Sequence, residues 1–142
     1  MSKLAVIRVR GSIHLRKDIK DTLSLLRLYH QNFCVVSENT PSFTGMVKKV
    51  KDYVTFGEID DATYKELVAK RAEEYKGRLK DAKGKIEYKK FLVVDGKKIK
   101  PFFRLNPPAK GFGRKGIKVS FKAKGALGYR ADKINDLIKR MI

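Results

Sequence analysis

Three short apolar stretches near the amino terminus decide the fold: LAVIRVR at residues 4–10, FCVV at 33–36 and YVTFGEI at 53–59. Each has the length and composition of a β-strand, and the first ends with apolar and basic side chains in alternation. Between them, residues 17–30 carry an amphipathic stripe. Residues 41–51 are expected to form a helix, because Thr40 suits its N-cap and Pro41 its first position. The order predicts a β-α-β-α-β unit.

The first strand also predicts how the unit is layered. Ala5, Ile7 and Val9 alternate toward one face, which leaves Arg8 and Arg10 on the other. We therefore predict an α/β fold of the α+β kind, a two-layer sandwich in which two helices cover one face of a three-stranded sheet. The other face of the sheet is expected to be open and cationic.

Residues 60–142 are expected to extend the unit that residues 1–59 form. Apolar residues recur at helical spacing near the end of the chain, so the final helix is predicted to dock on the core. The predicted elements are a helix over 60–75, a hairpin over 88–105 around Asp95-Gly96, a basic arm over 106–130 and a helix over 132–142 that Asp132 caps.

The charge is strongly positive and unevenly distributed. Lys and Arg number 34 against 15 Asp and Glu, which gives a formal net charge of +19. Residues 96–131 hold 11 basic side chains, no acidic one and six glycines. Such an excess indicates a polyanionic partner, most often nucleic acid and less often an anionic lipid surface. No run approaches the roughly 18 apolar residues of a membrane helix, so a membrane span is not expected.

The arm has two interpretations from composition alone. A glycine- and lysine-rich segment is typical of a solvated, disordered loop. Aromatic residues interleaved with the charges favour instead an arm that orders against phosphates, with rings that stack on bases or anchor it to the fold. These aromatic residues are Phe102, Phe103, Phe112, Phe121 and Tyr129.

Few residues suggest catalysis or cofactor binding. Cys34 is the single cysteine, which excludes an internal disulfide and, with only His14 and His30, a cysteine-rich zinc site. A reduced cytoplasmic location is the default expectation. Residues 111–116 match G-x-G-x-x-G, but prolines precede the match and a strand-like pattern follows it, so no dinucleotide site is expected. The acidic residues are scattered, and we predict no enzyme and no cofactor.

The predicted nucleic-acid surface combines basic side chains with the start of the second helix, where hydroxyls and free N–H groups suit a phosphate. Arginines rank first because a guanidinium binds phosphate bidentately and stacks on bases. The candidates on the unit are Arg8, Arg10, His14, Arg16, Lys17, Arg27, Thr40, Ser42, Lys48, Lys49 and Lys51. The candidates on the extension are Arg104, Lys110, Arg114, Lys115, Lys118, Lys122, Lys124 and Arg130.

Several stretches resemble the large-subunit ribosomal protein family called L-thirty, whose eukaryotic members are called L-seven. The likeness is to the longer, archaeal form and runs in collinear order. The stretches are LLRL at 25–28, NTPSFTGM at 39–46, VKDYVTFGEI at 50–59, PFFRLNPP at 101–108, GALGYR at 125–130 and KINDLIKRM at 133–141. Residues 75–100 depart from the pattern, because a hairpin replaces helical sequence there.

The resemblance implies a structural constituent of the large ribosomal subunit that binds large-subunit ribosomal RNA. It implies a monomer in the cytoplasm, near the 5S RNA region and beside neighbouring ribosomal proteins, with no membrane, small-molecule substrate, cofactor or catalysis. The main alternative is a sequence-tolerant DNA-binding or chromatin protein. Two others are an RNA-modifying or dinucleotide-dependent enzyme based on the glycine match, and an interaction protein that uses the helix at 60–75.

Overall fold

A central sheet organises the computed structural model, which describes residues 3–11, 13–77, 80, 82–85, 91–94 and 96–142. Strand β1 (Lys3–Arg8) lies between β2 (Phe33–Glu38) and β3 (Val54–Ile59) and runs antiparallel to both. Helices α1 (Lys17–Leu25) and α2 (Pro41–Lys49) connect the strands. The predicted β-α-β-α-β unit is confirmed.

Two short strands from the extension widen the sheet beyond the predicted three. β6 (Phe103–Arg104) pairs antiparallel with β2, and β7 (Gly128–Tyr129) pairs parallel with β3. The strand order is β6-β2-β1-β3-β7. The extension thus covers both edges of the core sheet, whose N–H and C=O groups would otherwise be unpaired.

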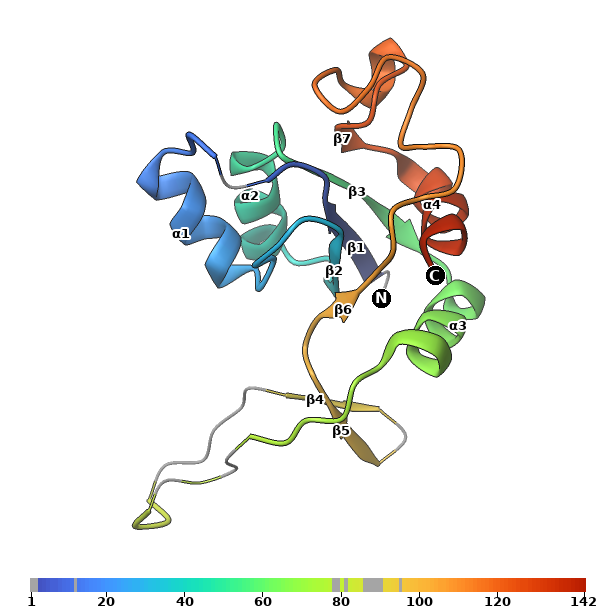
Figure 1. Cartoon of the computed structure of the whole chain (residues 1–142). Coiled ribbons are helices and arrows are strands. Elements are labelled where there is room, and N and C mark those ends of the chain that lie inside the picture. Colours follow the sequence, from blue (N-terminus) through green and yellow to red (C-terminus); the bar gives the residue numbers. More distant parts are fainter. Residues whose placement is uncertain (1–2, 12, 78–79, 81, 86–90, 95) are drawn as a thin grey trace.

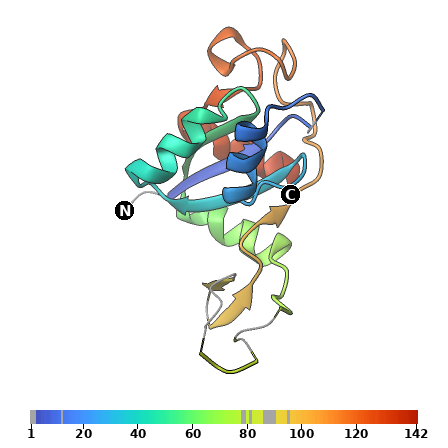
Figure 2. The same cartoon turned by 90° about the vertical axis from the view of Figure 1, so that its left-hand side faces the viewer.

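Both faces of the sheet are covered (Figures 1 and 2). Helices α1 and α2 pack on the side of Leu4 and Val6. Helices α3 (Asp61–Arg71) and α4 (Ile134–Met141) pack on the side of Ala5 and Ile7. The terminal helix packs on the core. The predicted open, cationic face is wrong, because α1 and α2 cover the face that carries Arg8, and α3 and α4 cover the opposite face, which was predicted to lie under α1 and α2.

The second helix begins as its sequence predicts, and the first ends early. Thr40 Oγ1 accepts a hydrogen bond from the Phe43 N–H, and Pro41 occupies the first turn of α2. Helix α1 ends at Leu25 rather than near residue 30. Arg27 adopts a left-handed conformation with φ of 64°, and the Leu28 N–H donates to the Leu23 carbonyl at 2.9 Å. These are features of a Schellman helix end.

Helix α3 also ends before its predicted limit of residue 75. The chain after Arg71 extends beside strand β5 (Lys97–Ile99), where the Tyr75 N–H donates to the Lys98 carbonyl at 3.0 Å. β4 (Leu92–Val94) pairs with β5, which confirms the predicted hairpin. Asp95 of its turn, like residues 88–90, lies outside the described residues, and Gly96 has φ of 76°.

The terminal helix starts later than predicted, because a 3₁₀ turn over Ala131–Lys133 precedes it. Asp132 lies in this turn, so the prediction that it caps the helix is wrong. Asn135 connects the starts of two helices instead: its Oδ1 accepts from the Asp60 N–H at 3.0 Å, and its Nδ2 donates to the Asp132 carbonyl at 2.8 Å.

The docking of α4 predicts a large effect of Leu137→Ala. Leu137 is 0% exposed, so its truncation leaves a cavity between α4 and the sheet. We expect the free energy of unfolding to fall by about 2–5 kcal/mol in urea titrations followed by circular dichroism. Lys139→Ala changes an exposed position of the same helix and is the control. Equal stability of the two variants would contradict the packing described here.

Candidate nucleic-acid interface

The basic arm folds back onto the core, where Arg130 holds its base. Arg130 is 4% exposed, and its Nε donates to Thr55 Oγ1 of β3 at 2.7 Å. Its Nη2 donates to the carbonyls of Phe112 at 2.7 Å and Ala126 at 3.0 Å, one on each side of the arm tip. Its guanidinium carbon lies 4.8 Å from the centroid of the Phe121 ring. One buried side chain therefore joins the sheet to both branches of the arm.

Burial explains the electrostatic state of Arg130. Loss of solvent lowers its pKa to about 10, and the nearby positive charge of Arg140 acts in the same direction. The group still carries its charge at neutral pH. Its hydrogen-bond acceptors are a hydroxyl and carbonyls rather than carboxylates. No carboxylate is hydrogen-bonded to Arg130 in the described residues, and the negative charge of Asp136 opposes the lowering of its pKa only in part.

A second arginine and two glycines also fix the arm. Arg140 Nη1 donates to the carbonyls of Ala109 at 2.9 Å and Gly111 at 2.7 Å, which ties the start of the arm to α4. A Cβ atom on Gly125 would overlap the Val119 carbonyl, and one on Gly113 would overlap the carbonyl of Gly125. These glycines permit close approach of backbone to backbone. Glycines, which in the sequence were typical of a disordered arm, are required here for tight packing of the arm.

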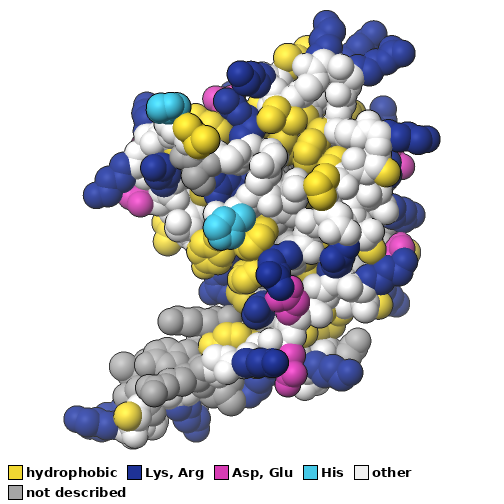
Figure 3. All heavy atoms as spheres, viewed as in Figure 1, with side chains coloured by type: hydrophobic (Ala, Val, Ile, Leu, Met, Phe, Trp, Pro, Cys, Tyr) yellow, Lys and Arg dark blue, Asp and Glu magenta, His cyan; other side chains and the backbone are white. Residues whose placement is uncertain are grey.

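The tip of this ordered arm carries the predicted cationic side chains. Figure 3 shows Lys and Arg side chains gathered at the top of the molecule, where the arm projects in Figure 1. A groove of about 610 Å³ lies at the base of the tip and includes Phe121, Tyr129 and Lys133 in its lining. The exposed members of this arm surface are Lys110, Arg114, Lys115, Lys118, Lys122 and Lys124.

Arg8 is not part of any exposed cationic face. It is 3% exposed, and its Nη1 donates to the Leu28 carbonyl at 2.8 Å while its Nε donates to the Arg10 carbonyl at 3.0 Å. Burial lowers its pKa below the ordinary value. Arg8 therefore supports the turn after α1. Arg8 and Arg130 are the two buried arginines among the candidates, and both bind backbone carbonyls of the segments above them.

The remaining candidates on the core lie on three parts of the surface, except for Arg27, which is half-buried in the turn after α1. Arg10 Nη1 donates to the Asp52 carbonyl at 3.4 Å, which places it beside the exposed end of α2. Lys48, Lys49 and Lys51 are exposed there. Thr40 and Ser42 are exposed at the opposite end of this nine-residue helix. His14, Arg16 and Lys17 are exposed before and at the start of α1, where Arg16 also pairs with Asp18 at 3.4 Å.

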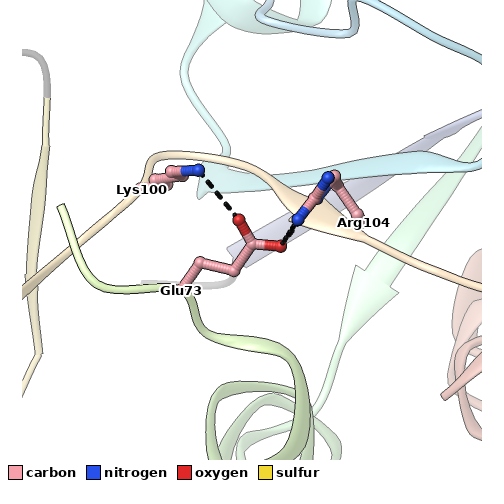
Figure 4. Close-up of polar contacts among 3 residues, drawn as sticks. All are labelled: Glu73, Lys100 and Arg104. Carbon is pink, nitrogen blue, oxygen red and sulfur yellow. Dashed lines mark hydrogen bonds and ion pairs between the residues drawn. The ribbon is translucent and has the colours of Figure 1, made fainter. Parts of the chain in front are cut away.

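Arg104 belongs to a charge cluster that the sequence did not reveal (Figure 4). Its Nε donates to Glu73 Oε1 at 2.6 Å, and Lys100 Nζ donates to Glu73 Oε2 at 3.0 Å. Burial alone would raise the pKa of Glu73, but the two cationic hydrogen-bond donors outweigh it and hold that pKa below the ordinary value. The carboxylate thus ties the hairpin root to β6 and offsets the charge of Arg104.

Sequence reasoning also missed Lys133 and the role of Tyr129 in the groove. Lys133 Nζ lies 5.7 Å from the centroid of the Phe121 ring, which the Arg130 guanidinium also contacts. The Tyr129 hydroxyl donates to the Glu58 carboxylate at 2.6 Å, and this hydrogen bond raises the tyrosine's pKa. The three-residue spacing of Arg130 and Lys133 could have indicated that both side chains lie on one side of a turn. It does so only if residues 131–133 form a 3₁₀ turn, which the sequence did not predict.

Two kinds of feature are absent from the described part of the chain. None of its helices has the length and apolarity required to cross a membrane. Over the same residues, His, Cys, Asp and Glu side chains form no group of three or more that is suited to hold a metal ion.

The fold and its surface define a small basic α+β protein with an ordered cationic arm. The ribosomal protein L30p/L7e family matches residues 4–54, which span the core unit up to the start of β3. Large ribosomal subunit protein uL30 of Nanoarchaeum equitans is 47% identical over 160 aligned positions that cover all of both chains. The proteins of the same name from Methanococcus maripaludis and Methanopyrus kandleri are 46% and 41% identical over 97% and 94% of this chain, and over 98% and 100% of their own.

The chain therefore belongs to the ribosomal protein L30p/L7e family, in its archaeal, full-length form. The resemblance seen in the sequence is confirmed, and the chain is a protein of the large ribosomal subunit. This membership also confirms that the chain is a ribosomal protein and not an enzyme.

The position of Arg130 predicts that Arg130→Met loosens the arm. The substitution keeps a long side chain but leaves Thr55 and the two carbonyls without their donor. Hydrogen bonds to a charged group contribute about 1.5–3 kcal/mol each, so the base of the arm should open more often. Hydrogen–deuterium exchange over residues 113–127 should accelerate. The exposed control Arg114→Met should leave exchange unchanged, and similar rates in both variants would exclude this role for Arg130.

The Glu73 cluster predicts a pH-dependent contribution to stability. Because its folded-state pKa lies below the ordinary value of 4.5, the stabilisation is present above that value and is lost as the pH falls through the folded pKa. Glu73→Gln should therefore lower the melting temperature at pH 6. The difference from the unmodified chain should shrink as the pH falls below 4.5. A difference that stays constant across this range would show that the charge of Glu73 does not contribute.

Proposed function

We propose that the chain binds large-subunit ribosomal RNA through the arm surface and the basic ends of α1 and α2. One observation carries the proposal: an arm free of acidic residues is folded so that its lysines and Arg114 are exposed to solvent while its anchor Arg130 is buried. The members on the core are Arg10, His14, Arg16, Lys17, Arg27, Thr40, Ser42, Lys48, Lys49 and Lys51.

Phosphate neutralisation explains the proposed binding. Each cation placed against a phosphate releases condensed counterions, so affinity should fall steeply with salt. RNA helices are recognised mainly through shape, phosphates and 2′-hydroxyls, which suits a projecting arm with many single charges. Anchors at Arg130 and Arg140 order the arm in advance, and an ordered arm loses less conformational entropy when it binds.

The two parts of the chain have different roles in the proposed function. In this proposal residues 1–59 form the RNA-binding core, and residues 60–142 extend the contact and brace the sheet. The chain acts as one copy within the subunit, near the 5S RNA region and beside neighbouring ribosomal proteins. Support for the setting comes from the full-length relatives, each of which is named as a large ribosomal subunit protein.

The test is to remove charge from the arm without removing its anchors. Arg114, Lys115, Lys118, Lys122 and Lys124 are replaced together by Gln, which leaves the carbonyls that bind Arg130 in place. We expect weaker binding to large-subunit ribosomal RNA and a log–log salt slope reduced by about 4, since each phosphate contact contributes about 0.7–0.9. Filter binding across a salt series measures both quantities.

A matched variant controls for net charge alone. Lys65, Lys70, Lys83, Lys97 and Lys139 are exposed and lie outside the proposed interface, so their replacement by Gln should change the slope little. In cells, the control variant should sediment with the large subunit through a high-salt gradient, and the arm variant should be depleted from it. Equal slopes for both variants would refute the arm's role. Preference for duplex DNA over ribosomal RNA would favour the chromatin alternative.

A further inference from the structure

A cleft away from the arm combines aromatic rings with positive charge. It has a volume of about 440 Å³, within the range of roughly 300–1,000 Å³ that ligand sites occupy. Its lining comes from the turn after α1, from the chain after α3 and from the chain just before β6. The residues that line it include Arg27, Tyr29, Tyr75, Lys76, Lys100 and Phe102. We call this the aromatic cleft.

The rings of the aromatic cleft are held by one another. Phe102 stacks on Phe33 with centroids 5.1 Å apart and an interplanar angle of 10°. Tyr29 meets Phe102 edge-on at 5.7 Å and is 44% exposed. His30 adds a further edge-on contact to Phe33 at 5.3 Å. Tyr29 is thus fixed against a ring cluster while a large part of its surface remains accessible.

The turn that presents Tyr29 is held by hydrogen bonds and contains two residues in the left-handed conformation. Arg27 and Asn32 both have positive φ, 64° and 68°, which is uncommon for residues other than glycine. The Arg8 guanidinium holds the Leu28 carbonyl, and the Asn32 N–H donates to the Arg8 carbonyl at 2.8 Å. Strain of this kind persists where surrounding structure enforces it, and it is found most often at binding sites.

The charges around the rings indicate an anionic ligand. Arg27, Lys76 and Lys100 line the aromatic cleft, and none of the described residues in its lining is acidic. Lys100 is already paired with Glu73, so Arg27 and Lys76 supply the positive charge for a ligand. Figure 3 shows hydrophobic side chains gathered where the turn after α1 approaches β6, with Lys and Arg side chains beside them. Rings that offer a stacking face, bordered by cations, are the features that bind single-stranded nucleic acid.

We propose that the aromatic cleft binds an unpaired base of ribosomal RNA, which stacks on Tyr29 while Arg27 and Lys76 contact the adjoining phosphates. The proposal rests on the RNA-binding function proposed above and adds a site for single-stranded RNA that is separate from the arm. Unpaired bases in loops and bulges are the parts of RNA that aromatic side chains recognise.

The test compares a short labelled oligoadenylate with an RNA duplex of the same chain length, using the full chain and fluorescence anisotropy. Tyr29→Leu should bind the oligoadenylate about five- to a hundredfold more weakly, which is the range expected for one lost base stack. Its affinity for the duplex should be unchanged. Tyr29→Phe keeps the ring and should bind both probes normally. Leu25→Ala, at a position that is 72% exposed in the last turn of α1, is the control.

The outcomes separate this inference from the proposed function. Normal oligoadenylate binding by Tyr29→Leu overturns the inference, and loss of duplex binding in the arm variant would still support the proposed function. Equal weakening for both probes also overturns it, because a base stack requires a single strand. If the unmodified chain binds neither probe, the proposed function fails and the inference fails with it.

Crosslinking in intact subunits provides a second readout. Ultraviolet irradiation of purified large subunits should attach a nucleotide to a peptide that contains Tyr29 or Phe102. Absence of that adduct would overturn the inference. Crosslinks from Lys76 and Lys100 to a neighbouring protein would also overturn it and would assign the aromatic cleft to a protein partner.

Discussion

The buried guanidinium of Arg130 is the interaction on which the rest of the structure depends. It lies where the last strand leaves the sheet, and its own N–H donates to the Phe56 carbonyl at 2.7 Å. Its partner Thr55 Oγ1 in turn donates to the Gly128 carbonyl at 3.0 Å. Strand β3, the arm and the turn before α4 therefore share one hydrogen-bonded centre. Removal of the guanidinium would leave several buried acceptors without a donor, which is more destabilising than its loss from the surface.

A buried charge of this kind also affects the surface above it. Burial is unfavourable for an ion unless hydrogen bonds compensate, and carbonyls compensate without neutralising it. The arm surface therefore lies over a positive charge that solvent screens only weakly. Lys133 adds another positive charge beside the Phe121 ring. An approaching phosphate would meet these charges together with the exposed lysines of the tip, so the preorganisation of the arm and its charge both favour binding.

The elements of the fold that the sequence predicts are those whose signals lie within a few neighbouring residues. Alternation identified β1, and Thr40 with Pro41 identified the start of α2, because each signal lies within a few residues. The burial of Arg8 and Arg130 could not be predicted in the same way. Alternation places Arg8 with Leu4 and Val6 on one face of the sheet, but it does not reveal that α1 and α2 cover that face or that the turn after α1 buries the guanidinium. Arg130 and Thr55 are 75 residues apart, and no local pattern connects them.

The site shows the same division between local and distant information. The acid-free charge of residues 96–131 correctly marked a cationic arm, but its glycines pointed to disorder. Glycine is favoured both in flexible chains and where backbones must touch, so composition alone cannot distinguish the two. The close approach of Gly113, Gly125 and Val119 resolves the ambiguity in favour of packing. An arm that is already folded presents its charges at fixed spacing, and fixed spacing lets a strongly basic protein select one RNA shape rather than bind every polyanion equally.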